Sequence, residues 1–542
     1  MKASKLFVKC LEAAGVKRMF GVPGEENLAF LDAVRDSKIE FITTRDEQSA
    51  VFMAATVGRL TGRVGVALST LGPGAPNLVT GVAYANLGAM PVLVITGQKP
   101  IRASKQGQFQ IIDVVRMMEP ITKYARTIPS ASRIPSMVYE AIKMAESERP
   151  GAVHLEFPED IAEEESREQP MEWKKVRRPN PDDKSIEMAA TMLKKAKRPI
   201  IVIGTGANRK LIRNQLRNFI SSTGIPFVTT QMGKGVEDES DERYLGTTAL
   251  SSGDFMHRAL EKSDCLLMVG HDIVEKPPVL THSKTTIIHV NFSPASVDAV
   301  YNPTLEVIGD ISHALWVLSE KLSGTIWDTK IFSKYKKALA KDIEDKAKDD
   351  ACPLKPQRIV SDLRASIPRD GVLSLDNGMY KIWIARNYPA YEQNSVLLDN
   401  ALASMGAGLP VGIATKMLFP KKPVVVLAGD GGFMMNVAEL ETAVRLKQEL
   451  VIVILNDNGY GMIKWKQSAM KLKNFGLTFT NPDFVKLAEA FGARGVRITK
   501  AVQFKTEVEK ALKSGGVHVI DVPIDYSENA SLNSLSKRTA SL

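Results

Sequence analysis

The stretch VVVLAGDGGFMMNVAELETAVRLKQELVIVILNDNGY, residues 424–460, decides the fold of this chain. It contains two apolar segments, VVVLAG at 424–429 and LVIVILN at 450–456, separated by a single amphipathic stretch of helical length. This pattern predicts two parallel strands joined by a right-handed helical crossover. Asp430 and Asp457 follow the two strands directly. Because ligands of such folds bind beyond the carboxyl ends of the strands, we expect both carboxylates at one binding edge.

The residues around these aspartates suit a divalent cation bound beside a phosphate. Gly431 and Gly432 allow the main chain to approach an anion closely. Carboxylate oxygens are ligands that Mg²⁺ prefers, and the ion is typically shared with the phosphates of a bound molecule. The alternative is structural, with Asp430 capping a helix and Gly431 forming a turn. The pair of aspartates favours a Mg²⁺ and diphosphate site.

The same residues carry a resemblance to a known family. GDGG at 429–432, followed by NDN at 456–458, resembles the signature of thiamine diphosphate enzymes. The resemblance implies that Asp430, Asp457 and the main-chain carbonyl of Gly459 bind Mg²⁺. Many members have Asn in place of Asp457, so this chain carries one more negative charge there, and we expect it to bind the metal more tightly.

A second match lies near the N-terminus, in FITTRDEQSAVFMAATVGRLTG at 41–62. This stretch predicts a strand, a short turn and a helix that begins near Glu47. A Glu in the first turn can simply stabilise the helix dipole. Thiamine diphosphate enzymes, however, carry a Glu here that hydrogen-bonds N1′ of the aminopyrimidine and promotes loss of the thiazolium C2 proton. The resemblance therefore implies a catalytic Glu47. Asp46 stands where relatives often have His.

Further loops resemble the cofactor-binding segments of the family. DNGMY at 376–380 resembles the loop that contacts the diphosphate, and ALASMGAGLP at 401–410 resembles the segment beneath the thiazolium. Met405 would hold the cofactor in a bent form that brings its reacting groups together. The cofactor-binding residues implied by the resemblance are Glu47, Pro23, Gly378, Met379, Tyr380, Ala403, Met405, Gly431, Gly432 and Met462.

Over nearly its whole length the chain resembles acetolactate synthases, with FGVPGEENL at 20–28 and KQGQFQIIDVV at 105–115 among the shared motifs. The resemblance implies that pyruvate loses CO₂ on thiamine diphosphate and that the enamine is joined to a second pyruvate, giving 2-acetolactate. Gln110 and Phe109 then act at the acceptor pocket, and Gln106 assists. Surface or packing roles are the alternative for these residues.

Histidine content favours joining of two substrates over simple decarboxylation. Decarboxylases of this fold commonly use an adjacent His pair to supply a proton, and the seven histidines of this chain include no such pair. His154 is expected to be structural. Synthases that prefer 2-oxobutyrate usually have Trp nine positions after the second metal ligand, where this chain has Lys466, beside Trp465. We therefore expect pyruvate to be the preferred acceptor.

Strand and helix patterns alternate along the chain and predict an α/β protein with three consecutive doubly wound parallel-sheet domains. We expect a pyrimidine-binding domain at 1–165, a central Rossmann-like domain at 185–320 and a diphosphate-binding domain at 356–542.

IVIGTGANR at 201–209 resembles a dinucleotide fingerprint, but Arg209 replaces its third glycine. FAD is therefore not favoured. An FAD-containing acetohydroxyacid synthase or a pyruvate oxidase-like enzyme is the alternative function.

Composition narrows the remaining function classes. The net charge of +10 on 542 residues comes from dispersed basic side chains, which argues against nucleic-acid binding. The sequence contains no apolar run of about twenty residues and no signal-peptide core, so we expect a cytoplasmic protein without a membrane partner. The three cysteines are too few and too scattered for a disulfide framework or a zinc site.

The resemblance also implies an assembly. In the family the catalytic Glu of one subunit meets the metal site of another, which implies a homodimer at minimum, and a homotetramer is common. Whether a regulatory subunit binds stays open. So does the role of the product, in branched-chain amino acid biosynthesis or in fermentation.

Overall fold

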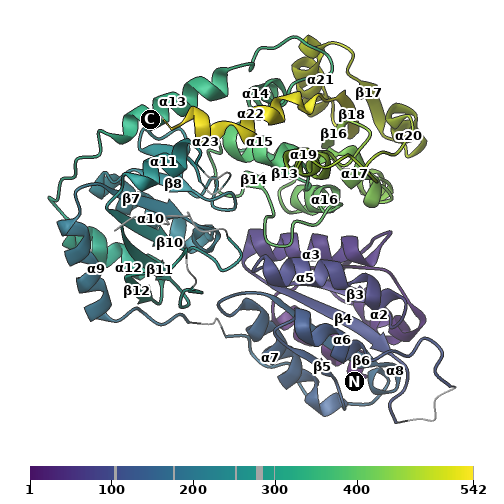
Figure 1. The fold of residues 1–542 in the computed structure, drawn as a ribbon. Helices are drawn as coiled ribbons and strands as arrows, with labels where there is room; N and C mark the ends of the chain where they lie inside the picture. The colour runs from purple at the N-terminus through teal and green to yellow at the C-terminus, as the bar shows by residue number, and fades with distance from the viewer. Residues whose placement is uncertain are drawn as a thin grey trace. The chain divides into compact units, whose positions relative to one another are not determined.

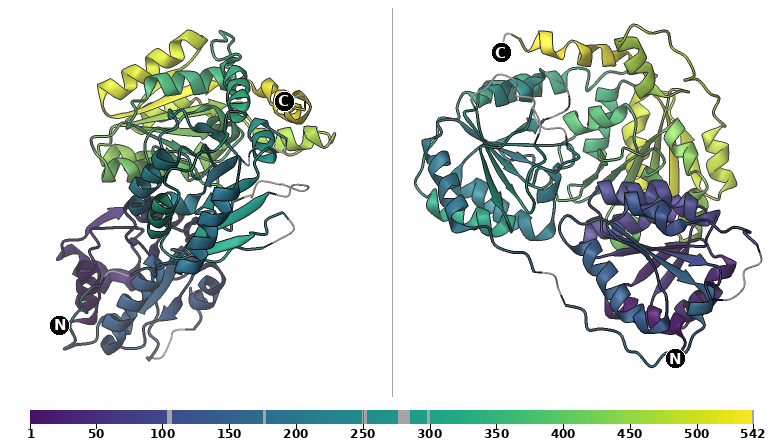
Figure 2. Two further views of the ribbon diagram at one scale, coloured as in Figure 1. Left: turned by 90° about the vertical axis from the view of Figure 1, so that its left-hand side faces the viewer. Right: turned by 60° about the horizontal axis from the view of Figure 1, so that its bottom comes forward.

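The computed structural model describes residues 1–102, 107–174, 177–248, 250, 253–275, 285–297 and 300–540. Within these residues the chain forms three six-stranded sheets whose strands pair in parallel, with helices on both faces (Figures 1 and 2). The predicted architecture of three doubly wound parallel sheets is confirmed. The domain boundaries 1–165, 185–320 and 356–542 stay a proposal.

The chain divides into two compact units, and each is described by itself. The first comprises Met1–Arg177, Ala401–Pro420 and Met435–Gln448, and the second comprises Arg178–Asn400, Lys421–Met434 and Glu449–Leu542. The first unit holds the N-terminal sheet, and the second holds the central and C-terminal sheets. The helices of the described residues are too short or too polar for any of them to cross a membrane.

The N-terminal sheet has the strand order β2-β1-β3-β4-β6-β5. Its strands are β1 Arg18–Gly21, β2 Glu40–Thr43, β3 Gly65–Ser69, β4 Val92–Gln98, β5 Ala125–Thr127 and β6 Ala152–Pro158. The surrounding helices are α1 Ala3–Ala13, η1 Glu25–Asn27, α2 Leu28–Arg35, α3 Glu47–Thr61, α4 Gly74–Asn77, α5 Val79–Leu87, α6 Val114–Met118, η2 Glu119–Ile121, η3 Ala131–Arg133, α7 Ile134–Glu146 and α8 Glu159–Ala162.

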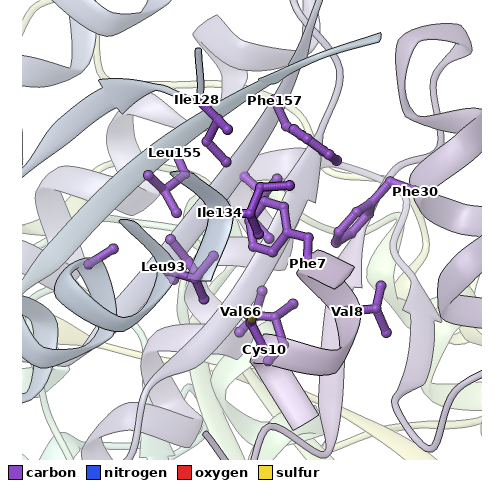
Figure 3. Close-up of a cluster of buried hydrophobic side chains, with 14 of the residues drawn as sticks. Phe7, Val8, Cys10, Phe30, Val66, Leu93, Ile128, Ile134, Leu155 and Phe157 are labelled. Carbon is purple, nitrogen blue, oxygen red and sulfur yellow. The ribbon is translucent and has the colours of Figure 1, made fainter. Parts of the chain in front are cut away.

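An apolar core joins α1, α2 and α7 to this sheet. Phe7, Phe30 and Phe157 point toward one another with ring centroids 5.1 to 6.0 Å apart in edge-to-face arrangements (Figure 3). Val66 and Leu93 belong to the same buried cluster. This core fixes the sheet on which the N-terminal candidate residues are placed.

Two helices from much later in the sequence complete the first unit. Helix α16, Gly408–Leu418, packs on α3, and helix α18, Glu439–Arg445, packs on α16. The main-chain N–H of Arg45 donates to Oε1 of the buried Glu439 at 2.9 Å. The turn that precedes Glu47 is therefore anchored by a residue 394 positions away from Arg45.

The central sheet has the order β12-β11-β10-β7-β8-β9. Its strands are β7 Pro199–Ile203, β8 Phe227–Thr229, β9 Tyr244–Thr247, β10 Cys265–Val269, β11 Thr286–Asn291 and β12 Leu305–Ile308. The accompanying helices are α9 Asp183–Lys195, η4 Thr205–Ala207, α10 Lys210–Thr223, α11 Phe255–Glu261, α12 Ile311–Lys321 and α13 Phe332–Glu344. The strand order reverses between β7 and β10, where open α/β sheets bind ligands.

The C-terminal sheet, β14-β13-β15-β16-β18-β17, repeats the relative strand order of the N-terminal sheet. Its strands are β13 Val372–Leu375, β14 Val396–Leu397, β15 Val424–Gly429, β16 Leu450–Asn456, β17 Arg494–Arg497 and β18 Val517–Pro523. Its helices are α14 Pro356–Ser366, α15 Tyr380–Asn387, α17 Asp430–Met435, α19 Gly461–Ala469, α20 Phe484–Ala490, α21 Ala501–Ser514, η5 Tyr526–Glu528, α22 Asn529–Asn533 and α23 Leu535–Arg538.

The crossover between β15 and β16 differs from the single helix expected from the sequence. It contains two short helices, α17 and α18, and the chain leaves the first at Met435. At the break, the buried Asn436 side-chain amide donates to the Gly406 carbonyl at 2.9 Å. This tertiary contact ties the segment between the two helices to the loop before α16.

Candidate active site

Glu47 begins helix α3 at the carboxyl edge of the N-terminal sheet. Asp46 is the N-cap residue, and its carboxylate accepts from the main-chain N–H of Gln48 at 2.8 Å and of Ser49 at 3.3 Å. Asn77 Nδ2 donates to Glu47 Oε2 at 3.0 Å. Among the described residues, Glu47 Oε1 has no hydrogen-bond partner. Asp46 therefore holds the helix end, while Asn77 orients Glu47 and leaves one oxygen available.

The loop after β3 lies directly against this carboxylate. A Cβ atom on Gly74 would lie 3.1 Å from Glu47 Oε1 and 2.4 Å from Ser69 Oγ, so a side chain at this position would clash. A Cβ on Gly72 would lie 3.0 Å from the main-chain oxygen of Gln110. The segment with Gln110 and the exposed Phe109 thus follows the glycine turn beside Glu47. Gln106 lies outside the described residues.

Asp430 is placed at the carboxyl edge of the C-terminal sheet, directly after β15, and is buried. Its Oδ1 accepts from the Gly431 main-chain N–H at 2.8 Å. Its Oδ2 accepts at 2.8 Å from both the main-chain N–H of Asn458 and the side-chain amide of Asn481. Burial raises the pKa of Asp430, and these hydrogen bonds oppose the rise. The carboxylate is therefore held in a fixed orientation.

Asp457 is the second carboxylate at this edge. Burial and the neighbouring charge of Asp430 raise its pKa to about 7, while Lys464 lowers it. The buried Asp430 and the half-buried Asp457 repel each other when both are ionised, and a divalent cation would neutralise this repulsion. The Gly459 carbonyl accepts from the Gly461 N–H at 3.2 Å and retains a second lone pair. This donor set suits Mg²⁺.

Glycines give the main chain close access to this edge. A Cβ on Gly432 would lie 3.1 Å from the Asp376 carboxyl group, and one on Gly431 would lie 2.9 Å from Tyr460 Cε1. The buried ring of Tyr380 covers Gly378, whose Cβ would lie 2.4 Å from Tyr380 Cε1. Met379 is also buried. A side chain at Gly431 would press on the Tyr460 ring, and one at Gly432 on the Asp376 carboxyl group, so the packing at this edge favours glycine at both positions.

Left-handed main-chain conformations occur at three non-glycine residues of the candidate segments. Ala403 has a φ of 58°, Gln110 of 60° and Asn458 of 50°. Such conformations cost about 1 kcal/mol or more and concentrate at functional sites. Met405 is half-buried in the same loop as Ala403. The loop before α16 therefore has the strained geometry of a binding segment.

Two further predicted residues lie in open positions. Pro23 is exposed between β1 and η1, and Met462 is half-exposed in α19. Helix α19 has no buried residue, and Lys466 Nζ lies 4.7 Å from the centre of the Trp465 ring. The structure thus groups the candidates into an N-terminal half-site around Glu47 and a C-terminal half-site around Asp430.

Several site residues were not identified from the sequence. Asn481, 51 positions after Asp430, also donates to the side-chain oxygens of Asn456 and Asn458 at 3.1 Å each. Asn77 orients Glu47 in the same indirect way. Asn481 lies in a loop, and Asn77 ends helix α4; both act through tertiary contacts that no local pattern predicts.

Comparison with known proteins matches all three parts of the chain to one family. Models described as the thiamine pyrophosphate enzyme N-terminal TPP binding domain, central domain and C-terminal TPP binding domain match residues 1–117, 186–318 and 376–522. The chain is 33% identical over 541 residues to "Acetolactate synthase" of Bacillus subtilis (strain 168), covering 98% of this chain and 95% of the relative.

Two further relatives carry similar names. "Acetolactate synthase, catabolic" of Raoultella terrigena is 31% identical over 531 residues, covering 97% of this chain and 95% of the relative. "Acetolactate synthase isozyme 2 large subunit" of Escherichia coli (strain K12) is 30% identical over 539 residues, covering 98% of this chain and 96% of the relative. The chain belongs to the acetolactate synthase family of thiamine pyrophosphate enzymes. The resemblance inferred from the motifs is thereby confirmed.

The central domain of this family member has its own carboxylate where a dinucleotide phosphate would bind. The main-chain N–H of Thr205, in the loop after β7, donates to both Glu275 oxygens at 3.1 Å. The Thr230 hydroxyl and the Asp272 main-chain N–H also donate to this side chain. Burial raises the pKa of Glu275 to about 7. In dinucleotide-binding folds, a phosphate of the ligand binds at the main-chain amides of this loop. Here the Thr205 amide already bonds to Glu275, so the geometry does not support FAD binding.

We expect added FAD not to bind this acetolactate synthase family member. The measurement is fluorescence anisotropy of FAD during titration with the protein, with a flavin-dependent synthase as the positive control. Anisotropy should stay at the value of free FAD. Saturable binding at micromolar protein would contradict this expectation and restore the flavin-containing alternative.

His154 does not supply the proton that decarboxylases of the fold take from histidine. It is fully buried in β6, and its Nε2 lies 2.8 Å from Thr96 Oγ1. Burial lowers its pKa to about 3, so the ring is neutral at physiological pH. This environment fits the structural role expected from the sequence.

Proposed function

We propose that this chain is an acetolactate synthase that uses thiamine diphosphate and Mg²⁺ to convert two pyruvate ions and one proton into 2-acetolactate and CO₂. The observation that carries the proposal is the pair of half-sites on one chain of this family: Glu47, with one oxygen unbonded among the residues that the structure describes, and the Asp430–Asp457 pair. A catalytically silent relative would have no need of both.

The residues of the C-terminal half-site fit a metal-bound diphosphate. Asp430, Asp457 and the Gly459 carbonyl would hold Mg²⁺, and Gly431 and Gly432 would lie beside the phosphates. Asn481 and the Asn458 main-chain N–H keep the Asp430 carboxylate in place. Gly378, Met379 and Tyr380 would line the diphosphate from the loop after β13.

Thiamine diphosphate, when bound, supplies the carbanion-stabilising chemistry that releases CO₂ from a 2-oxoacid and joins the remaining unit to a second carbonyl. The N-terminal half-site contributes the proton transfer. Glu47 Oε1 would share a proton with the aminopyrimidine, and Asn77 fixes the carboxyl group through Oε2. Pro23, Ala403, Met405 and Met462 would position the cofactor, and Gln110 and Phe109 would contact the acceptor.

The proposal extends to assembly and location. We propose a homodimer at minimum, in which Glu47 of one subunit serves the metal site of another, and a homotetramer as the complete form. The cytoplasm is the proposed location. Branched-chain amino acid biosynthesis and fermentation remain alternative uses of the product.

Incubation of the purified chain with pyruvate, thiamine diphosphate and Mg²⁺, without FAD, is expected to yield 2-acetolactate. The product is measured as acetoin after acid treatment, with samples lacking either cofactor as controls. With equimolar 2-oxobutyrate present, the pyruvate product should still predominate, because Lys466 replaces the Trp expected for 2-oxobutyrate preference. CO₂ with free acetaldehyde, or turnover only with FAD, would assign the chain to another branch.

A further inference from the structure

A partly buried ion pair, Lys99–Glu26, lies at the carboxyl edge of the N-terminal sheet, which also carries the Glu47 half-site. Lys99 directly follows β4, Thr70 directly follows β3, and Glu26 lies in η1 after β1. These three strands are adjacent in the sheet, and the strand order reverses between β1 and β3. Such reversal points are where open α/β sheets bind ligands.

Glu26 holds Lys99 in one place. Lys99 Nζ donates to Glu26 Oε1 at 2.6 Å, and the Thr70 hydroxyl donates to Glu26 Oε2. The Glu26 side chain is 3% exposed. Burial alone would raise its pKa, but the hydrogen bonds from Lys99 and Thr70 bring it below the ordinary value. Glu26 is therefore an ionised group with both oxygens occupied.

Lys99 keeps capacity to bind a further anion. An ammonium group has three N–H donors, and Glu26 is its single hydrogen-bond partner among the described residues. Its side chain is 25% exposed, in contrast to Glu26. The hydrogen bond to Glu26, and the charges of Glu26, Glu159 and Glu25, raise the Lys99 pKa. Lys99 thus presents a fixed positive charge with free donors.

This charge is close to the proton-transfer residue. A Cβ on Gly74 would lie 3.0 Å from Thr70 Cγ2 and 3.1 Å from Glu47 Oε1. Thr70 therefore has Glu47 on one side and the Glu26–Lys99 pair on the other. Lys99 and Glu47 are thus linked through the Glu26 carboxylate, Thr70 and the Gly74 turn.

We propose that Lys99, held by Glu26 and Thr70, binds the carboxylate group of the 2-oxoacid substrate. This inference rests on the proposed function, since the family reaction requires substrates that carry one carboxylate beside a carbonyl. Lys99 is then a specificity-determining residue, and Glu26 is a positioning residue that acts through it.

The test compares the wild type with Lys99→Met and Lys99→Gln, which shorten the side chain by one heavy atom and remove its charge. We expect the KM for pyruvate to rise about 10- to 100-fold, as for loss of a charge-assisted hydrogen bond. Binding of oxamate, an unreactive carboxylate mimic of pyruvate, should weaken by a similar factor in calorimetry. Affinity for thiamine diphosphate should stay within about 3-fold, because the proposal places Lys99 at the substrate carboxylate. Lys143→Met, on the exposed face of α7, is the matched control.

Unchanged oxamate affinity in whichever of the two variants folds would overturn the proposal. An equal loss of thiamine diphosphate affinity would also overturn it, because the ion pair would then support the cofactor site. If the wild type binds oxamate through Lys99 but forms no acetolactate from pyruvate, the proposed function fails while the carboxylate site stands. Calorimetry and the product assay therefore separate the two failures.

Discussion

Replacing Glu47 with Gln is expected to lower pyruvate turnover about 10²- to 10⁴-fold, the usual contribution of a positioned acid–base group. Gln keeps the size of the side chain and can still accept a hydrogen bond from Asn77, but its amide cannot take up and return a proton. Affinity for thiamine diphosphate should therefore change little. The measurements are kcat for acetolactate formation and the rate at which the cofactor C2 proton exchanges with deuterium.

Glu40→Gln is the matched control for this change. Glu40 is an exposed residue of β2 that pairs with Arg18 at 2.8 Å, and its removal should leave kcat unaltered. A Glu47→Gln variant that keeps more than about a tenth of the wild-type kcat would show that Glu47 serves only the helix terminus. Loss of cofactor affinity instead of kcat would assign Glu47 a binding role.

The second large effect concerns Asp457, whose pKa is raised to about 7 by burial and by Asp430. A carboxyl with a raised folded-state pKa binds its proton more tightly when folded, so its ionisation destabilises the fold. The destabilisation is absent below pH 4, grows as pH rises and is complete above pH 7. The full shift corresponds to about 4 kcal/mol, and solvent screening reduces our expectation to about 2 kcal/mol.

Three consequences are measurable by urea denaturation at pH 5.5 and pH 8. Without cofactor, Asp457→Asn should be more stable than the wild type at pH 8, and the gain should shrink at pH 5.5. Mg²⁺ with thiamine diphosphate should stabilise the wild type more at pH 8 than at pH 5.5, because at pH 5.5 the cation must first displace a proton from Asp457. Mg²⁺ should also bind Asp457→Asn more weakly than the wild type.

Asp483→Asn is the control, and its expected effect on stability is opposite in sign to that of Asp457→Asn. Asp483 caps α20, and hydrogen bonds from the main chain of Lys486 and Val485 hold its pKa below the ordinary value. Its removal should cost stability at pH 8 and leave Mg²⁺ binding unchanged. A wild type whose metal affinity is the same at both pH values, or an Asp457→Asn variant with undiminished affinity, would contradict the assignment of Asp457 as a ligand.

Features of the structure that depend on a local sequence pattern can be predicted from the sequence. Strand ends are visible where apolar runs stop, so the amino-acid sequence alone places Asp430, Asp457 and Glu47 at the edges of sheets. The family resemblance then supplies roles for them. Three parallel sheets follow from the alternation of strand and helix signals.

Structural features that depend on contacts between residues far apart in the sequence could not be predicted from local patterns. Asn481 reaches Asp430 from 51 positions away, and Lys99 reaches Glu26 from 73 positions away. The left-handed conformation of Ala403 has no sequence signal, since alanine ordinarily avoids it. The contact of Asn436 with Gly406, at the break between α17 and α18, likewise has no local sequence signal.

The late arrival of α16 and α18 in the first unit has a consequence for synthesis on the ribosome. Residues 1–177 emerge early, yet the face of α3 remains uncovered until Gly408–Leu418 has been translated. The bond from Arg45 to Glu439 must wait longer still. Since domains usually fold as they emerge, this one holds an exposed apolar helix through much of elongation. The helix that carries Glu47 therefore exposes apolar surface to chaperones until α16 has been translated.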